Sequence, residues 1–164
     1  WVCHPYVSDD ISNNDLKNII VDSYMHFSNP NISPVTTIEH NNYILVLFYG
    51  PSFAFKDYAL QFLGNLLTYA LPKASKKLTV LGATSGDTGS AAIHAFRGKQ
   101  DINVFILHPH NRVSDVQRRQ MTTVQDDNIY NSEIKGNFDD WQKIVKELCI
   151  DDEIQQQNSI TTIK

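Results

Sequence analysis

The sequence predicts an α/β fold in which helices cover a parallel β-sheet. Two buried apolar segments, Leu78–Leu81 and Ile102–Leu107, and a third strand at Asn128–Ile134 alternate with segments of helical pattern. Strands joined through helices pair in parallel, and such a sheet is covered on both faces. The glycine-rich segment Leu81–Ala92 follows the first strand, where open parallel sheets bind their ligands.

Three helices are expected in this half of the chain. A small-residue helix is closed by Gly98, and an apolar stripe marks the last of the three. The predicted helices are Asp87–Phe96, about Ser114–Thr123, and Phe138–Cys149. The tail from Asp151 to Lys164 is acidic and then rich in Gln, Asn and Thr, so we expect a loop there.

The first half of the chain predicts two helices and a hairpin. Asparagine is a good N-cap, β-branched and aromatic runs favour strands, and proline ends helices. The expected elements are a helix from Asn13 or Asn14 to about Phe27, a hairpin of Val35–Glu39 and Tyr43–Phe48, and a helix from about Lys56 to Leu71 with Pro72 just after its end.

Composition excludes several classes of protein. The chain has 164 residues, 41% hydrophobic and 20% charged, which is typical of a globular domain. A net charge of −4 without a basic run argues against a nucleic-acid groove, and no apolar run could span a bilayer. Cys3 and Cys149 form neither a zinc motif nor a disulfide framework. We expect a cytoplasmic protein without a membrane or nucleic-acid partner.

The loop from Leu81 to Ala92 is the first candidate site. Its glycines permit close approach, and a helix start at Asp87 presents free N–H groups that suit a carboxylate or small phosphate. It matches neither the phosphate-gripping GxxxxGK[ST] motif nor the dinucleotide GxGxxG fingerprint. The alternative is a structural turn in which Asp87 caps the helix.

Lys56 is the second candidate, because it lies between apolar segments at the start of a helix. A lysine there is commonly an exposed surface residue. An apolar pocket and the positive end of a helix would instead favour a neutral amine that can act as nucleophile or base. The pair His108 and His110 lacks a third ligand, so no metal site is predicted.

Four ordered segments together resemble the threonine synthases, a family of pyridoxal-phosphate (PLP) enzymes. They are "YGPSFAFKDYALQFLGNLL", "LTVLGATSGDTGSAAIHAFRGK", "VFILHPHNRVSDVQRRQMTTV" and "GNFDDWQKIVKEL", and the match runs from about Asp15 to about Leu148. The resemblance implies the N-terminal portion of a fold-type II PLP enzyme. Residues 1–30 would end a small N-terminal region, and residues 31–164 would form part of the PLP-binding catalytic domain.

The resemblance also implies a reaction, the conversion of O-phospho-L-homoserine and water to L-threonine and phosphate. Lys56 falls on the lysine that the family joins covalently to pyridoxal 5′-phosphate, and its freed amine would move the protons at Cα and Cβ. Asp87 falls near the 3′-oxygen of the cofactor, where many relatives carry asparagine. Thr84, Ser85 and Thr88 would hold the substrate carboxylate, in agreement with an anion-binding helix start.

The chain departs from the family pattern in two ways. Tyr49 and Ser52 replace the histidine and threonine of an HGPT-like motif. The family's glycine-rich loop for the PLP phosphate, and its residue facing the pyridine nitrogen, would lie beyond Lys164. Three alternatives therefore stay open: a related phospho-lyase acting on O-phosphothreonine, a catalytically incomplete fragment that binds PLP weakly or not at all, and a nucleotide-binding module.

Overall fold

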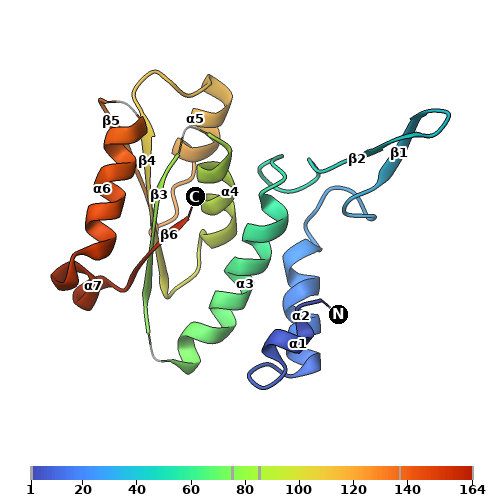
Figure 1. Ribbon diagram of the computed structural model, residues 1–164, viewed down its shortest axis with the longest axis horizontal. Coiled ribbons are helices and arrows are strands. Elements are labelled where there is room, and N and C mark those ends of the chain that lie inside the picture. Colours follow the sequence, from blue (N-terminus) through green and yellow to red (C-terminus); the bar gives the residue numbers. More distant parts are fainter. Residues whose placement is uncertain (1, 75, 85, 137, 164) are drawn as a thin grey trace.

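The computed structural model describes residues 2–74, 76–84, 86–136 and 138–163, and its centre is a four-stranded sheet (Figure 1). All neighbouring strands are parallel, in the order β5-β4-β3-β6. The strands are β3 (Leu78–Ala83), β4 (Ile102–Pro109), β5 (Ile129–Ile134) and β6 (Ile160–Ile163). The predicted parallel sheet is thereby confirmed.

Helices cover both faces of this sheet, as Figure 1 shows. On one face lie α4 (Asp87–Phe96), α5 (Asp115–Thr122) and, outside α4, α3 (Asp57–Lys73). On the other face lie α6 (Phe138–Ile150) and α7 (Asp152–Asn158). The N-terminal helices α1 (His4–Val7) and α2 (Asn13–Tyr24) come before the hairpin, and α2 packs against α3.

The core lies between the sheet and α4. Ile102, Val104 and Ile106 alternate along β4 and are fully buried, in agreement with the two-residue period of a strand. Ala91 and Ala92 are small enough to let α4 approach the sheet closely. Each large aliphatic side chain buried in this way contributes about 1.5–3 kcal/mol. The core thus fixes the start of α4 at the carboxyl edge of the sheet.

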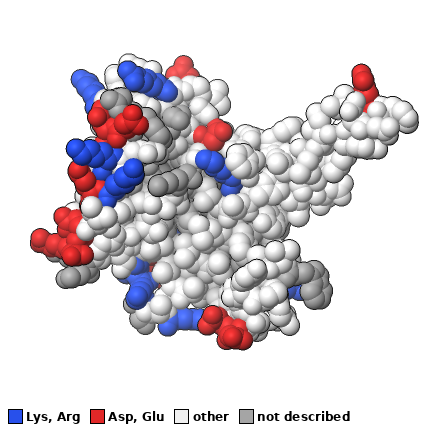
Figure 2. Space-filling view, in the orientation of Figure 1, with Lys and Arg blue, Asp and Glu red and all other residues white. Residues whose placement is uncertain are grey.

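The hairpin of β1 (Val35–Glu39) and β2 (Asn42–Leu45) projects from this body. Asn41 takes a positive φ of 67° in the turn, which asparagine tolerates better than most residues. Figure 2 shows the hairpin almost free of charge, whereas both signs are interspersed over the sheet and helices. Ile38 and Tyr43 are more than half exposed on it, so its apolar surface is uncovered. No helix in the described ranges is long and apolar enough to cross a membrane.

Several predicted boundaries were wrong in the first half of the chain. Ser12, rather than Asn13 or Asn14, caps α2, because its Oγ accepts from the N–H of Asp15 at 3.1 Å. Pro72 lies inside α3. A proline in the last turn removes its own N–H bond, but the helix continues past it, since the N–H of Ala74 still donates to the Ala70 carbonyl at 3.2 Å.

The tail was also predicted wrongly, since it forms α7 and β6 rather than a loop. Asp151 caps α7 by accepting from the N–H of Ile154 at 3.1 Å. Ile160–Ile163 then pairs in parallel with β3, which supplies the hydrogen bonds that a short strand lacks by itself.

Candidate functional site

The loop between β3 and α4 is built around Thr84. This residue is 5% exposed, and its Oγ1 accepts from the N–H groups of Gly86 at 3.1 Å and Gly89 at 3.2 Å. Thr84 thus satisfies one backbone N–H of the turn and one of the helix start. In the alternative of a purely structural turn, Asp87 was expected to cap this helix. A Cβ at Gly89 would lie 2.5 Å from Thr84 Cγ2 and 2.6 Å from Met121 Sδ, so only glycine fits there.

The start of α4 keeps donors available for an anion. Asp87 and Thr88 are its first residues, and their backbone N–H groups have no partner within the described part of the chain. Free N–H groups at a helix N-terminus attract negative charge. Ser85, a predicted carboxylate ligand, lies outside the described residues.

Lys56 lies at the N-cap position of α3 and its side chain is half-buried. Its Nζ donates to Thr88 Oγ1, although the two residues are 32 positions apart. The structure therefore brings together two of the predicted site residues, one from each helix start. The flanking Phe53 and Phe55 are 67% and 61% exposed. The apolar pocket that the sequence suggested around Lys56 is therefore not formed by its neighbours in the chain.

Asp57 is a residue of this site that the sequence analysis missed. It is fully buried, and its carboxylate accepts from Ser52 N–H at 2.8 Å and from Ser52 Oγ at 2.7 Å. A Cβ at Gly50 would lie 2.4 Å from Asp57 Oδ2. Asp57 therefore closes the loop that leads into Lys56. An acid in a first helical turn is ordinarily exposed, so only the serine five positions earlier could have signalled this bond.

Helix α5 reaches both loops. Gln117 Nε2 donates to Asp87 Oδ1 at 2.6 Å, and Gln120 Nε2 donates to the Ser52 carbonyl at 3.3 Å. The Asp87 side chain is itself exposed, beside the turn. Neither glutamine was predicted as part of the site. The Ser-x-x-Gln spacing from Ser114 was the one available signal, since it is typical of a helix start.

The two histidines at the end of β4 separate. His108 is 3% exposed, and its Nδ1 has no partner within the described ranges. His110 Nδ1 lies 3.1 Å from Glu133 Oε1, and hydrogen bonding to His110 holds the pKa of Glu133 below its usual range. The two histidines therefore have different surroundings, since His108 is buried and His110 pairs with Glu133.

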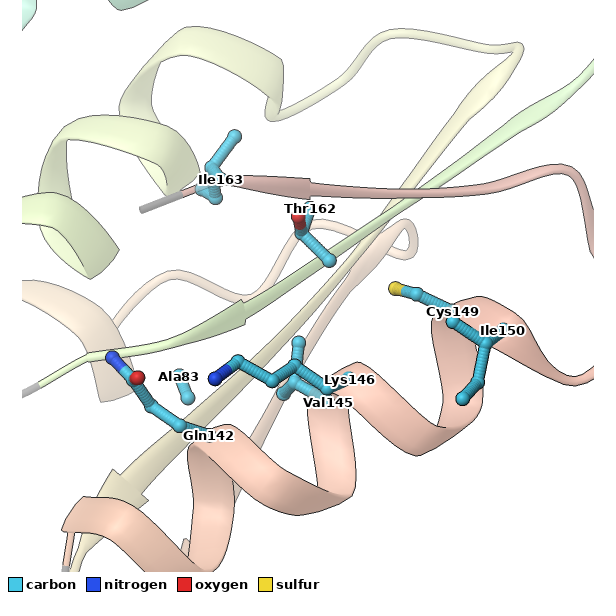
Figure 3. Close-up of a pocket in the computed structure, with 8 residues that line it drawn as sticks. All are labelled: Ala83, Gln142, Val145, Lys146, Cys149, Ile150, Thr162 and Ile163. Carbon is cyan, nitrogen blue, oxygen red and sulfur yellow. The ribbon is translucent and has the colours of Figure 1, made fainter.

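A small apolar hollow lies on the opposite face of the sheet, between α6 and strands β3 and β6 (Figure 3). Its volume is about 160 Å³, and Lys146 and Gln142 border it with Val145 and Cys149. None of the predicted site residues that the structure describes lines it, so it is distinct from the site at the carboxyl edge of the sheet.

Comparison with known proteins gives a consistent result. No family model matches the chain. Threonine synthase from Pseudomonas aeruginosa is 50% identical over 88% of this chain and 31% of its own length, and that from Eremothecium gossypii is 46% identical over 96% and 33%. The similarity to threonine synthase-like 2 from Xenopus laevis is lower, at 33% identity over 97% and 34%. The chain spans about a third of the length of these relatives.

Solved structures give the same match. PLP-bound threonine synthase from Brucella melitensis superimposes with a TM-score of 0.92 at 39% identity, over 98% of this chain and 34% of that one. Diaminopropionate ammonia lyase from Escherichia coli shares the fold alone, with a TM-score of 0.51 and 15% identity over 93% and 42%.

Proposed function

We propose that this chain, a homologue of threonine synthase over nearly its whole length, forms the lysine-bearing part of a PLP-dependent threonine synthase. The reaction would convert O-phospho-L-homoserine and water to L-threonine and phosphate. The observation that carries the proposal is the contact between Lys56 Nζ and Thr88 Oγ1, which joins the starts of α3 and α4. Residues 1–30 would end the N-terminal region and residues 31–164 would begin the catalytic domain.

The residues of the site fit PLP. A half-buried primary amine suits an aldehyde, and the free N–H groups of Asp87 and Thr88 suit an anionic group beside it. When bound, PLP supplies an electron sink for the charge that develops at the substrate Cα. Asp87, with its carboxylate fixed by Gln117, would face the 3′-oxygen of the cofactor.

Lys56 would hold the cofactor and, once released, move protons at Cα and Cβ. Its hydrogen bond to Thr88 Oγ1 orients the amine toward the start of α4, where the substrate would lie. Thr88 would thereby link proton transfer to substrate binding.

The substrate carboxylate would bind at the start of α4. Among the described residues, the N–H groups of Asp87 and Thr88 are free donors there, and the predicted ligands Thr84, Ser85 and Thr88 would add their hydroxyls. Because Thr84 Oγ1 already accepts two backbone bonds, it would act on the substrate as a donor only.

The compartment follows from the same proposal. Cys3 and Cys149 are free thiols, which fits a reducing compartment and a cytoplasmic enzyme.

The test replaces Lys56 with alanine in the full-length protein that carries this chain. Lys56→Ala is expected to abolish the visible absorbance band that forms on adding PLP, and to lower threonine formation from O-phosphohomoserine by at least about 100-fold. The matched control is Lys77→Ala, because Lys77 is exposed and outside the site.

Two outcomes would contradict the proposal. One is an unchanged absorbance band in Lys56→Ala. The other is a preference of the wild-type protein for O-phosphothreonine, which would favour the related phospho-lyase. Tyr49, which replaces the family's histidine and packs against Phe48 at a ring distance of 5.0 Å, is the residue that would explain such a preference.

A further inference from the structure

We propose that Gln117 is a positioning residue that fixes the Asp87 carboxylate relative to Lys56. The inference rests on the proposed function, since Asp87 matters only if PLP binds beside it. The 2.6 Å bond from Gln117 Nε2 to Asp87 Oδ1 joins residues of two helices that are 30 positions apart in the sequence.

The amide of Gln117 has a defined orientation. Ser114 Oγ donates to Gln117 Oε1 at 3.0 Å, which leaves Nε2 to face Asp87. An ionised carboxylate only accepts hydrogen bonds, so the nitrogen is also the only atom of the amide that can face it favourably. In a capping box the glutamine at this position would bond back to its own helix start. Here Oε1 does accept from the hydroxyl of the N-cap residue Ser114, and Nε2 donates across to Asp87 at the same time.

The amide also packs against the turn itself. A Cβ at Gly86 would lie 2.6 Å from Gln117 Nε2, so the glycine lets the side chain lie directly on the backbone. Gln117 thus contacts both the N-cap residue of α4 and its first residue. An exposed carboxylate such as Asp87 would otherwise sample several rotamers.

Helix α5 is fixed to the lysine loop as well. Gln120 lies one turn after Gln117, and its Nε2 donates to the Ser52 carbonyl at 3.3 Å. Ser52 in turn binds Asp57, the residue after Lys56. The position that Gln117 gives to Asp87 is therefore a position relative to the lysine.

Gln117 is a neutral hydrogen-bond donor, so it holds Asp87 without adding a positive charge beside it. An arginine or lysine would hold Asp87 equally well but would offset its negative charge. Arg118, the next residue of the helix, lies 3.7 Å from Asp115 of the same helix. An amide orients Asp87 and leaves its charge free to act on the ionisation of the cofactor.

The experiment titrates the visible absorbance band of PLP in the full-length protein. Gln117→Ala is expected to shift the pH midpoint of this band by about 0.5–1 unit, the usual value of one hydrogen bond. Gln117→Glu is expected to add a second titration step. Two carboxyls at this spacing share a proton, so the hydrogen bond to Asp87 that the wild type makes is kept only at pH values below that step. The control is Gln100→Glu, which adds the same charge at an exposed position before β4.

Other ionisable groups lie on the elements around Asp87 and are common to all variants. They are Lys56 at the N-cap of α3, His108 on β4, and Asp115, Arg118 and Arg119 on α5. Their titration cancels when Gln117→Glu is compared with Gln117→Ala. Circular dichroism and melting temperatures close to the wild type in both variants would show that the fold is kept. If Gln117→Ala unfolds, Gln117→Glu is used for the test, at pH values below its added titration step.

Midpoints in both variants equal to that of Gln100→Glu would overturn the inference while leaving the proposed function intact. Absence of any PLP band in the wild-type protein would overturn the proposed function, and this inference with it.

Discussion

At the residue scale, the shape of the lysine loop depends on one buried carboxylate. A buried charge is tolerated when hydrogen bonds replace its water, and Ser52 supplies two donors to Asp57. In the same loop Gly50 lies directly against Asp57. Phe53 takes a φ of 61° and its side chain is exposed. The sequence singled out Lys56 as a candidate but gave no sign that its neighbour would be buried, because this depends on the closure of the loop.

Ser52→Ala tests this bond. The change removes the hydroxyl donor to Asp57 and is expected to lower the free energy of unfolding by about 1.5–3 kcal/mol, the range for a hydrogen bond to a charged group. Ser52→Thr keeps the hydroxyl and is expected to lose much less. Urea titration of both variants gives the difference, and equal losses would contradict the role of the hydroxyl.

At the scale of elements, α3 joins the two halves of the molecule. Phe62, Leu66 and Tyr69 lie on one face of it and pack with the buried cluster that includes Leu16 and Ile19 of α2. A second apolar stripe faces the core beneath α4, where Leu60 and Leu71 are buried. The spacing of apolar residues along a helix does not say how many neighbours the helix has, so the two-sided packing of α3 appears only in the fold.

Gly64→Ala tests the contact between α3 and α4. At an open helical position this change would raise stability by about 1 kcal/mol. Here the new Cβ would lie 2.5 Å from the Ala95 carbonyl oxygen, so the helices must separate, and a loss of about 1–3 kcal/mol is expected.

The control on the same helix is Ala70→Gly at an exposed position, where propensity alone applies and about 1 kcal/mol should be lost. Urea unfolding measures both variants. A stabilised Gly64→Ala would show that the two helices are not in close contact.

At the scale of the whole molecule, the parallel sheet collects the site at one edge. Lys56 and Thr84 lie in the loops before α3 and α4, Asp57 and Asp87 are the first residues of these helices, and α5 adds glutamines to both. His94 lies in the last turn of α4, away from the helix start. Burial lowers its pKa below the ordinary 6.5, and Arg97 acts in the same direction against the opposite effects of Asp57 and Asp126.

The pKa of His94 predicts how stability changes with pH. Because the folded state binds this proton less tightly than the unfolded chain, stability is lost as pH falls through about 6.5. His94→Gln removes the effect, so its stability is expected to fall less than that of the wild type between about pH 7.5 and about pH 5.5.

Thermal unfolding at both pH values measures the difference between His94→Gln and the wild type. The control is His40→Gln in the exposed hairpin turn, which should follow the wild type. If the stability of His94→Gln had the same pH dependence as that of the wild type, a lowered pKa of His94 would be contradicted.

The sequence by itself determined the order of the strands and helices in the middle of the chain. α4 has the predicted bounds Asp87–Phe96, and Gly98 takes the positive φ of 70° expected after a helix end. Periodicity, caps and glycines are local properties, so a linear pattern is enough to read them. The ordered motifs likewise identified the homologues.

Only the tertiary structure decided which residues surround that lysine. The bonds from Lys56 to Thr88, from Gln117 to Asp87 and from Gln120 to Ser52 each join residues 30 or more positions apart. The pairing of β6 with β3 is of the same kind, because its partner strand lies some 80 positions earlier in the chain. Such contacts arise when the sheet brings separate loops to one edge, and no local pattern in the sequence encodes that closeness.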